Sequence, residues 1–365
     1  MPELPEVEVV RAGLEPAVVG ATVTAVTVFD ERSLRRHLGP SEDFVDRLTG
    51  AELCVPSRRG KYLWIPLLAP ASQMKAIATG VPGIPVTGSA ADAGLPSFGI
   101  HREALVVHLG MSGQVLLRNA ATDDALTRIR IDLRHPQHGP LRLNFVDQRI
   151  FGSMAIDELV TTTDRPDERV PTTVSHIARD PLDPHFDDAL FLRRLAARKT
   201  GIKRALLDQT LISGIGNIYA DEALWSARVH YDQPTNTLSR PRATLLLAEV
   251  RNILARALAE GGTSFDAQYL NVNGQSGYFS RSLNAYGQQG LPCPRCGRPI
   301  IREQFMNRGS HFCPRCQRVR GARLTVGPAQ CHPAQPSPIL HRPDNAVFRN
   351  QCGCCGGSID HKPPQ

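Results

Sequence analysis

Four cysteines near the C-terminal end constrain the fold of this 365-residue chain more than any other feature. Cys293, Cys296, Cys313 and Cys316 form two C-x2-C pairs separated by sixteen residues. Each pair can lie on a tight turn and present two thiolates, and two such turns make a tetrahedral site. Because four thiolates leave no open position, we expect one structural zinc ion (Zn) in a ribbon over residues 284–317. The alternative is four free thiols.

The predicted ribbon is rich in basic side chains. They are Arg295, Arg298, Arg302, Arg308, His311, Arg315 and Arg318. A basic hairpin can lie along DNA and contact its phosphates, and a net charge of +7 with a pI near 9.1 favours a polyanionic partner. Solvated arginines without a target are the alternative.

The sequence shows no mark of a membrane or secreted protein. No apolar run approaches the roughly 18 residues that a membrane helix needs, and no basic-then-apolar signal peptide opens the chain. We therefore expect a soluble cytosolic protein, whose cysteines are metal ligands or free thiols before disulfides. Cys54 is expected to be buried and inert. A second metal site is an open alternative for the tail cysteines, which are Cys331, Cys352, Cys354 and Cys355.

The length predicts two or three domains, because single cores rarely grow past about 250 residues. Residues 1–160 read as a β-sandwich or barrel domain, interrupted by a flexible insertion at 68–102 that is rich in Ala, Gly, Pro and Ser. The polar stretch 161–184 is expected to be a linker, and 185–283 a helical domain. After the ribbon, residues 318–365 are expected to be a disordered tail.

Residue periodicity predicts the individual elements of these domains. The expected helices cover residues 5–14, 187–198, 203–211, 217–227 and 241–260. The expected strands cover residues 21–29, 62–67, 104–109, 128–133 and 141–146. Gly214 and Gly216 break the chain between the second and third helices of the helical domain.

The chain resembles the formamidopyrimidine-DNA glycosylases, bacterial enzymes that repair 8-oxoguanine, from residue 1 to about 317 outside the insertion. The opening Met1-Pro2-Glu3-Leu4-Pro5-Glu6-Val7-Glu8 carries the resemblance together with the ribbon. Five further motifs follow in family order: Gly60-Lys61-Tyr62, His108-Leu109-Gly110-Met111-Ser112-Gly113, Asp147-Gln148-Arg149-Ile150-Phe151-Gly152, Ile212-Ser213-Gly214-Ile215-Gly216-Asn217 and Asn307-Arg308-Gly309-Ser310-His311-Phe312-Cys313. Leu4 favours this family over its sister, endonuclease VIII, which typically has Gly at that place.

The resemblance implies an α+β multidomain fold: an N-terminal β-sandwich with flanking helices, a helix–two-turn–helix domain with a lesion loop, and a C-terminal zinc ribbon. It also implies a base-excision-repair enzyme that flips out and removes oxidised purines and then cleaves the abasic site by β,δ-elimination. The expected partner is double-stranded DNA with oxidised bases, bound in the cleft between two lobes. A monomer in the bacterial cytosol, associated with the nucleoid, would follow.

The family resemblance makes Pro2 the nucleophile once Met1 is removed. An α-amino group titrates near pH ~8, so a useful fraction of this secondary amine is neutral at physiological pH. Its attack on C1′ gives an iminium that cannot lose an N–H proton and therefore persists as an electron sink. Without the resemblance, Pro2 would be an uninformative terminal residue.

Four further residues match catalytic positions of the family. Glu3 looks like the proton donor to O4′. Glu6 resembles a supporting carboxylate, although a favourable charge in a first helical turn is an equal alternative. Lys61 matches the lysine of proton transfer, and taken alone it would be a surface lysine. Arg308 matches the arginine that holds the phosphates beside the lesion and assists δ-elimination.

Three residues match those that fill the gap left by a flipped nucleotide: Met111 as a compliant wedge, Arg149 as a partner for the orphaned base, and Phe151 as a stacking plate. From composition alone, Met111 and Phe151 would be ordinary core. Ile150 stands where relatives often have a basic residue, and we expect a small consequence.

Other matches are to DNA-contacting positions. Asn217 can present its side chain to a phosphate at a helix start, or it can cap the helix. Lys199 and Lys203 fit lysines on the phosphate and lesion side. Arg128 stands where relatives often have a histidine. Residues 263–278 resemble the loop that closes over the flipped base.

Two other functions remain to be separated from this one. An endonuclease VIII-like enzyme would prefer oxidised pyrimidines, and Leu4 argues against it. A DNA-binding module without catalysis would need to lose the nucleophile or its acid, yet Pro2 and Glu3 are both present.

Overall fold

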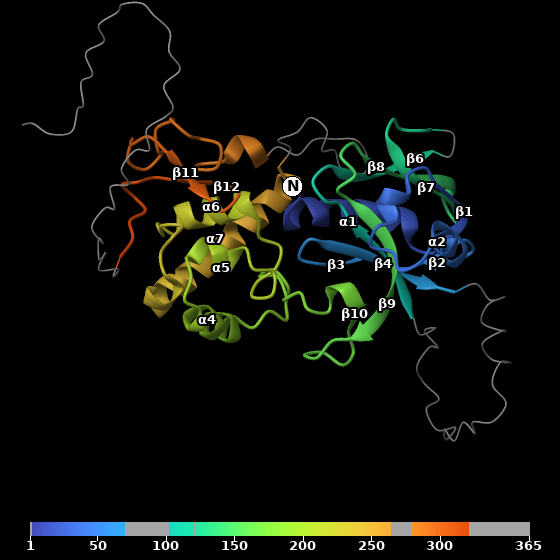
Figure 1. The fold of residues 1–365 in the computed structure, drawn as a ribbon, viewed down its shortest axis with the longest axis horizontal. Helices are drawn as coiled ribbons and strands as arrows, with labels where there is room; N and C mark the ends of the chain where they lie inside the picture. The colour runs from blue at the N-terminus through green and yellow to red at the C-terminus, as the bar shows by residue number, and fades with distance from the viewer. Residues whose placement is uncertain (1, 70–101, 120–121, 264–278, 321–365) are drawn as a thin grey trace, which may run out of the picture. The chain divides into compact units, whose positions relative to one another are not determined.

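The computed structural model describes residues 2–69, 102–119, 122–263 and 279–320 (Figure 1). Nearly all of the predicted insertion 68–102, of the predicted loop 263–278 and of the predicted tail 318–365 lies outside the described residues. The predictions made for those segments therefore stay predictions.

The N-terminal region is one antiparallel sheet of ten strands. Its strands are β1 (Thr22–Val28), β2 (Glu52–Leu53), β3 (Ser57–Arg59), β4 (Tyr62–Leu68), β5 (Glu103–His108), β6 (Gly113–Asn119), β7 (Thr127–His135), β8 (Gly139–Asp147), β9 (Ser153–Thr161) and β10 (Arg169–Pro171). The order is β10-β9-β5-β4-β2-β1-β7-β8-β6, with β3 paired to β4. β1 joins the two halves of this path, because it pairs with β2 at Thr22↔Glu52 and with β7 along its length.

One apolar core lies between the two halves of the sheet. Ile131 and Leu143 come from one half, and Leu63 and Leu105 from the other. The helices α1 (Leu4–Val18) and α2 (Ser41–Leu48) pack against the same core. On α1 the buried side chains recur at helical spacing, with Leu14 fully buried, as the sequence predicts. The predicted sandwich with flanking helices is confirmed.

The span 161–184 differs from the linker that its composition predicts. It contains β10, which pairs with β9, and the 3-10 helix η2 (Thr172–Val174). Val170 and Val174 are buried against Trp64 in a small second core. The polar residues around these two valines conceal the strand in the sequence.

The helical region contains α4 (Asp188–Ala197), α5 (Ile202–Leu206), α6 (Asn217–Ser226), α7 (Arg240–Ala259) and the 3-10 helices η3 (Thr235–Thr237) and η4 (Phe279–Ser282). The helix predicted over 203–211 is shorter, because the Asp208 carboxylate accepts hydrogen bonds from the amide and hydroxyl of Thr210 and starts a turn. The ribbon hairpin follows, with β11 (Ile301–Phe305) antiparallel to β12 (Arg308–Phe312). None of the described helices is long and apolar enough to cross a bilayer.

Candidate active site

Glu3 lies at the point where the start of α1 meets the start of α6. Its side chain is 2% exposed. Its carboxylate accepts hydrogen bonds from the backbone N–H groups of Gly216 (2.6 Å) and Ile218 (3.0 Å). A Cβ at Gly216 would lie 2.3 Å from this carboxylate, so the turn before α6 requires glycine here. Glu3 therefore caps α6 from a distant part of the chain.

The pKa of Glu3 is raised above its ordinary value of 4.5, chiefly because burial penalises the charged form. The charge of Lys61 and the amides of α6 oppose this rise, whereas the neighbouring carboxylate of Glu6 adds to it. A carboxyl that keeps its proton more readily than an exposed glutamate is suited to donating that proton.

Glu6 links the N-terminus of the chain to the residues after α7. Its carboxylate accepts hydrogen bonds from the Glu3 amide (2.8 Å), the Tyr219 hydroxyl (2.6 Å) and the Thr263 amide (2.7 Å). Pro2 is buried beside this cluster. These contacts exceed those of a charge that only serves the first turn of α1.

A cavity of about 670 Å³ brings together residues from four parts of the sequence, one of them in the helical region. Lys61, which follows β3, His108 at the end of β5 and Arg308 at the start of β12 all line it. Burial first, and then the charge of Arg308, lower the pKa of Lys61, while Glu3 acts to raise it. Lys61 and Arg308 are thus brought to one site, as their predicted roles require.

His108 belongs to this site although the sequence analysis gave it no role. Burial, and then the charges of Arg36 and Arg35, lower its pKa to about 4, so the ring is neutral at physiological pH. His108 stands in the same motif as Met111, and this position was the one sequence feature that could have indicated its place in the site.

The predicted gap-filling residues lie on two adjoining loops. Met111 is 43% exposed and Phe151 is 46% exposed, and Arg149 is also exposed, so the core alternative is wrong for the two apolar residues. The Asp147 carboxylate ties the loops, because it accepts hydrogen bonds from the Ser112 hydroxyl (2.5 Å) and the Gly152 amide (2.6 Å).

A clamp that the sequence did not predict holds the second loop. The Arg35 guanidinium donates to the carbonyl of Ile150 (2.5 Å) and to that of Phe151. Ile150 has a φ of 54°, a conformation that β-branched residues rarely adopt. The Arg128 guanidinium donates to the Asp147 carbonyl (2.8 Å), so this predicted DNA contact supports the same loop.

Of the remaining predicted DNA contacts, Lys203 and Asn217 meet at the carbonyl of Gly309. Lys199 is exposed. Lys203 is fully buried, and its ammonium lies 2.6 Å from a carboxylate oxygen of Asp221, whereas the sequence predicted a side chain that reaches DNA. Asn217 is the first residue of α6, and its side-chain amide donates to the Gly309 carbonyl (3.2 Å).

The four ribbon cysteines form one cluster, with their Sγ atoms all within 4.8 Å of one another. Four thiolates at this spacing match the tetrahedral coordination of zinc. The Arg295 guanidinium stacks 3.8 Å from the Trp225 ring and donates to the Trp225 carbonyl (2.5 Å), which docks the first cysteine pair on the end of α6.

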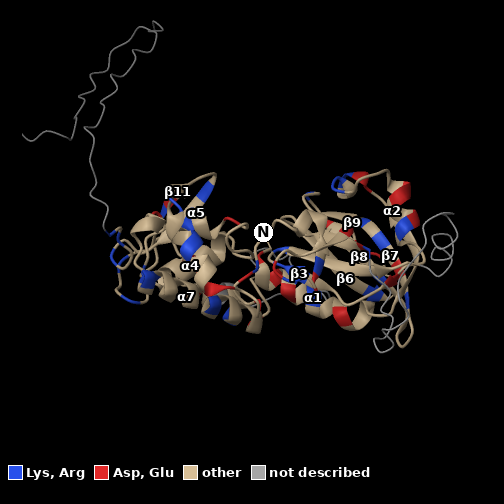
Figure 2. Cartoon of the chain, turned by 90° about the horizontal axis from the view of Figure 1, so that it is seen from below, with Lys and Arg blue, Asp and Glu red and all other residues tan. Residues whose placement is uncertain are grey.

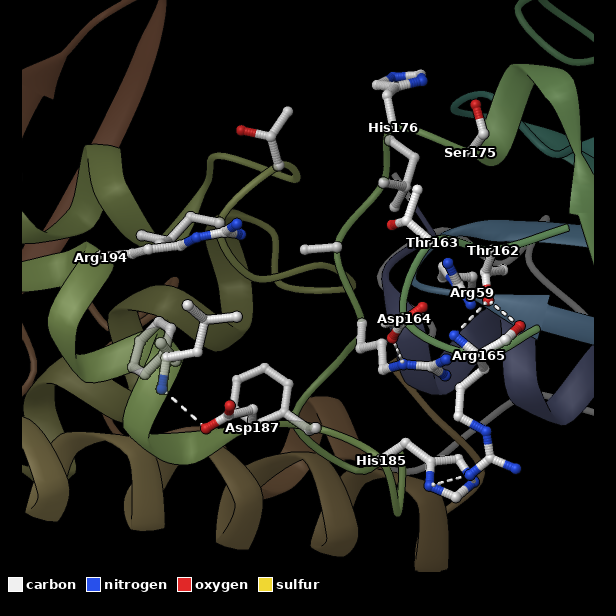
Figure 3. A pocket seen from close by; sticks show the side chains of 18 residues that line it. Arg59, Thr162, Thr163, Asp164, Arg165, Ser175, His176, His185, Asp187 and Arg194 are labelled. Carbon is white, nitrogen blue, oxygen red and sulfur yellow. Dashed lines mark hydrogen bonds and ion pairs between the residues drawn. The ribbon is translucent and has the colours of Figure 1, made fainter. Parts of the chain in front are cut away.

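A second cavity of about 540 Å³ contains none of the predicted site residues (Figure 3). Two of its arginines are neutralised by carboxylates, since Arg59 pairs with Glu168 (2.7 Å) and Arg179 pairs with Asp164 (2.6 Å). Acidic and basic residues also lie close together near α1 and β3 (Figure 2). Because Arg59 and Arg179 are already paired within the protein, we assign this cavity no chemistry.

Family models match three parts of the chain. Residues 1–154 match the formamidopyrimidine-DNA glycosylase N-terminal domain, and residues 177–268 match the formamidopyrimidine-DNA glycosylase H2TH domain. Residues 290–319 match the zinc finger found in FPG and IleRS. With the cysteine cluster, this last match shows that the ribbon binds one structural zinc ion.

Whole-chain comparisons agree with these matches. The formamidopyrimidine-DNA glycosylase of Leifsonia xyli is 59% identical, covering 87% of this chain and 100% of the relative. That of Thermobifida fusca is 51% identical, covering 88% and 100%. Among solved structures, a Lactococcus lactis Fpg in complex with DNA containing an abasic site has a TM-score of 0.66 at 29% identity, covering 87% of this chain and 99% of that one.

Proposed function

This chain belongs to the formamidopyrimidine-DNA glycosylase family and is a glycosylase and abasic-site lyase of base-excision repair, and we propose that it releases oxidised purines through the secondary amine of Pro2. The observation that carries the proposal is the junction of α1 and α6, where the buried acid Glu3 adjoins Pro2. The partner is double-stranded DNA that contains 8-oxoguanine or a formamidopyrimidine.

The proposed chemistry begins with removal of Met1. The lone pair of the Pro2 nitrogen attacks C1′, the bond from C1′ to the base breaks, and the base leaves with the proton that the Pro2 nitrogen gives up. Glu3 gives its proton to O4′ as the sugar ring opens, which leaves a positively charged iminium between Pro2 and C1′. The raised pKa of Glu3 supports this role, because the proton is present when it is needed.

Strand cleavage follows from the iminium. It acidifies the C2′ hydrogens, so loss of one of these protons expels the 3′ phosphate in β-elimination, and a second elimination expels the 5′ phosphate. Lys61, with its pKa lowered by burial, assists proton transfer, and Arg308 holds the phosphates. Their shared place on one cavity supports these two roles.

The two tied loops supply the residues that replace the flipped nucleotide. Met111, Arg149 and Phe151 would enter the duplex, and their exposure supports this use. The zinc ion holds the ribbon that carries Arg308, and it takes no part in bond making.

Borohydride trapping tests the proposal. Zinc-loaded protein, confirmed to lack Met1, is mixed with a duplex that holds one 8-oxoguanine opposite cytosine, and the reduced adduct is mapped by mass spectrometry. We expect a covalent adduct at Pro2 and none with an undamaged duplex. Tight binding without an adduct would contradict the proposed nucleophile, and an adduct found only with a thymine glycol duplex would contradict the proposed lesion class.

A further inference from the structure

Lys203 on α5 and Asp221 on α6 form an ion pair that is closed to solvent. Their exposed fractions are 0% and 1%, and the Lys203 Nζ lies 2.6 Å from Asp221 Oδ1. The same ammonium donates to the Gly309 carbonyl (3.2 Å) and lies 4.9 Å from the centre of the Phe305 ring. The Lys203 ammonium is therefore surrounded by a carboxylate, a backbone carbonyl and an aromatic ring of the protein itself.

The pair binds the backbone that follows Arg308. Asp221 Oδ1 accepts a hydrogen bond from the Ser310 hydroxyl (3.0 Å), and Asp221 Oδ2 accepts one from the His311 amide (2.9 Å). Together with Lys203 on Gly309, these bonds hold three consecutive residues of β12. Arg308 is the one exposed residue of that strand, whereas the next four are buried.

A buried ion pair is a weak source of stability, because desolvation of the two charges opposes their attraction. The ribbon is joined to α6 in another way, through Arg295 and Trp225. The opposite strand of the hairpin also has its own anchor, since the Tyr231 hydroxyl donates to Glu303 (2.6 Å). Attachment of the ribbon therefore does not account for the pair.

We infer that Lys203 and Asp221 are positioning residues. They hold the backbone of residues 309–311 in place and thereby direct the Arg308 guanidinium into the cavity that it shares with Lys61. The inference rests on the proposed function, in which Arg308 holds the phosphates during δ-elimination. It also gives Lys203 a role that needs no contact with DNA.

The test replaces both charges at once, so that neither is left alone in the interior. Lys203→Met with Asp221→Asn keeps the side-chain volumes and leaves an acceptor for the His311 amide. Tyr231→Phe is the matched control, because it removes the anchor of the opposite strand only. Zinc content and melting temperature are measured for every variant, and single-turnover β and β,δ products are followed on a duplex with a preformed abasic site.

In the double variant we expect the β,δ-elimination rate to fall by about 10- to 100-fold, with β-elimination and the Pro2 adduct retained. When Arg308→Ala is added, the rate should fall no further than about twofold below that of Arg308→Ala alone. Tyr231→Phe should resemble the unsubstituted protein. Ser310→Ala, which leaves both charges in place, should show a smaller loss in the same direction even if the double variant fails to fold.

Three results would overturn the inference: an unchanged β,δ rate in the double variant or in Ser310→Ala, a loss that adds fully to that of Arg308→Ala, or an equal loss in Tyr231→Phe. The trapped adduct separates these results from failure of the proposed function. If the unsubstituted protein forms no adduct at Pro2 on the same duplex, both the proposed function and the inference fall.

Discussion

Glu3 and Asp221 are both buried carboxylates that meet helix α6, yet they are held by different partners. Glu3 lies at the N-terminus of the helix and accepts hydrogen bonds from backbone amides such as those of Gly216 and Ile218. Asp221 lies within the helix and has the Lys203 ammonium at 2.6 Å. Both carboxylates accept hydrogen bonds from neutral donors, but only Asp221 has in addition an opposite charge in direct contact.

The difference in partners suits Glu3 to donating a proton and Asp221 to anchoring the ribbon. We call Glu3 the acid, and Asp221 with Lys203 the anchor. Neutral donors leave burial as the largest influence on Glu3, so its pKa rises and the proton stays available for transfer. The ammonium beside Asp221 instead completes a fixed network that binds the ribbon backbone. Helix α6 thus contacts the proposed proton donor at its N-terminus and carries a positioning residue, Asp221, in its interior.

The largest expected difference between the two sites is in base release. Glu3→Gln removes the proposed proton donor, so release of 8-oxoguanine should fall by at least about 100-fold. The Lys203→Met, Asp221→Asn double variant should keep its base-release rate within about tenfold. Single-turnover excision measures both, with duplex binding as the control for folding. Retained turnover in Glu3→Gln would break the comparison.

The free energy of unfolding should rank the two sites in the opposite order, with the larger loss at Asp221. Asp221→Asn alone leaves the Lys203 charge buried without its partner, which should lower the free energy of unfolding by about 3–5 kcal/mol. Glu3→Gln removes a carboxyl that burial already disfavours as an anion, and we expect a smaller change. Urea unfolding of the zinc-loaded variants measures this, and an equal loss in the two variants would contradict the distinction.

Loss of the zinc ion should disturb the ribbon that Lys203 and Asp221 hold, and it should leave the surroundings of Glu3 unchanged. Cys296→Ser disorders the ribbon, so the affinity for a duplex with a stable abasic-site analogue should fall about tenfold or more, as phosphate contacts are lost. Glu3 is held instead by backbone amides at the start of α6, outside the ribbon. Binding titrations with parallel zinc assays measure the effect. Unchanged affinity in protein without zinc would show that the ribbon does not hold DNA.

Sequence reasoning reached the acid more readily than the anchor. Glu3 and Gly216 stand in recognisable motifs, and the cysteine spacing predicted the ribbon. Asp221 looked like any polar residue on a helix, because its burial depends on a strand nearly ninety residues away in the chain. Lys203 was assigned to DNA for the same reason, since local sequence does not record whether a lysine reaches solvent.

Prediction of the fold succeeded and failed for the same reason. Periodicity predicted α1 and five of the ten strands of the sheet (β1, β4, β5, β7 and β8), because one face of each packs on a local core. The strand β10 was missed, since its burial depends on Trp64 far earlier in the sequence. Arg35, whose bonds reach the carbonyls of Ile150 and Phe151, was missed likewise.

The smallest expected effect is on the pH dependence of stability. The pKa of Glu3 is higher in the folded protein than its ordinary value of 4.5, so between these two values the folded protein binds more protons than the unfolded chain. The free energy of unfolding should therefore fall as the pH rises through this window. The Glu3→Gln variant lacks this titration, so its melting temperature should rise relative to the unsubstituted protein over the same window. A constant difference across the window would contradict the sign.

The most direct test of the account is the pKa of the Glu3 carboxyl itself. It can be followed by carbon-13 NMR of the zinc-loaded protein without Met1, with Glu3→Gln as the blank that identifies the signal. The account predicts a titration clearly above pH 4.5. A titration at or below that value would contradict the assignment of Glu3 as the proton donor.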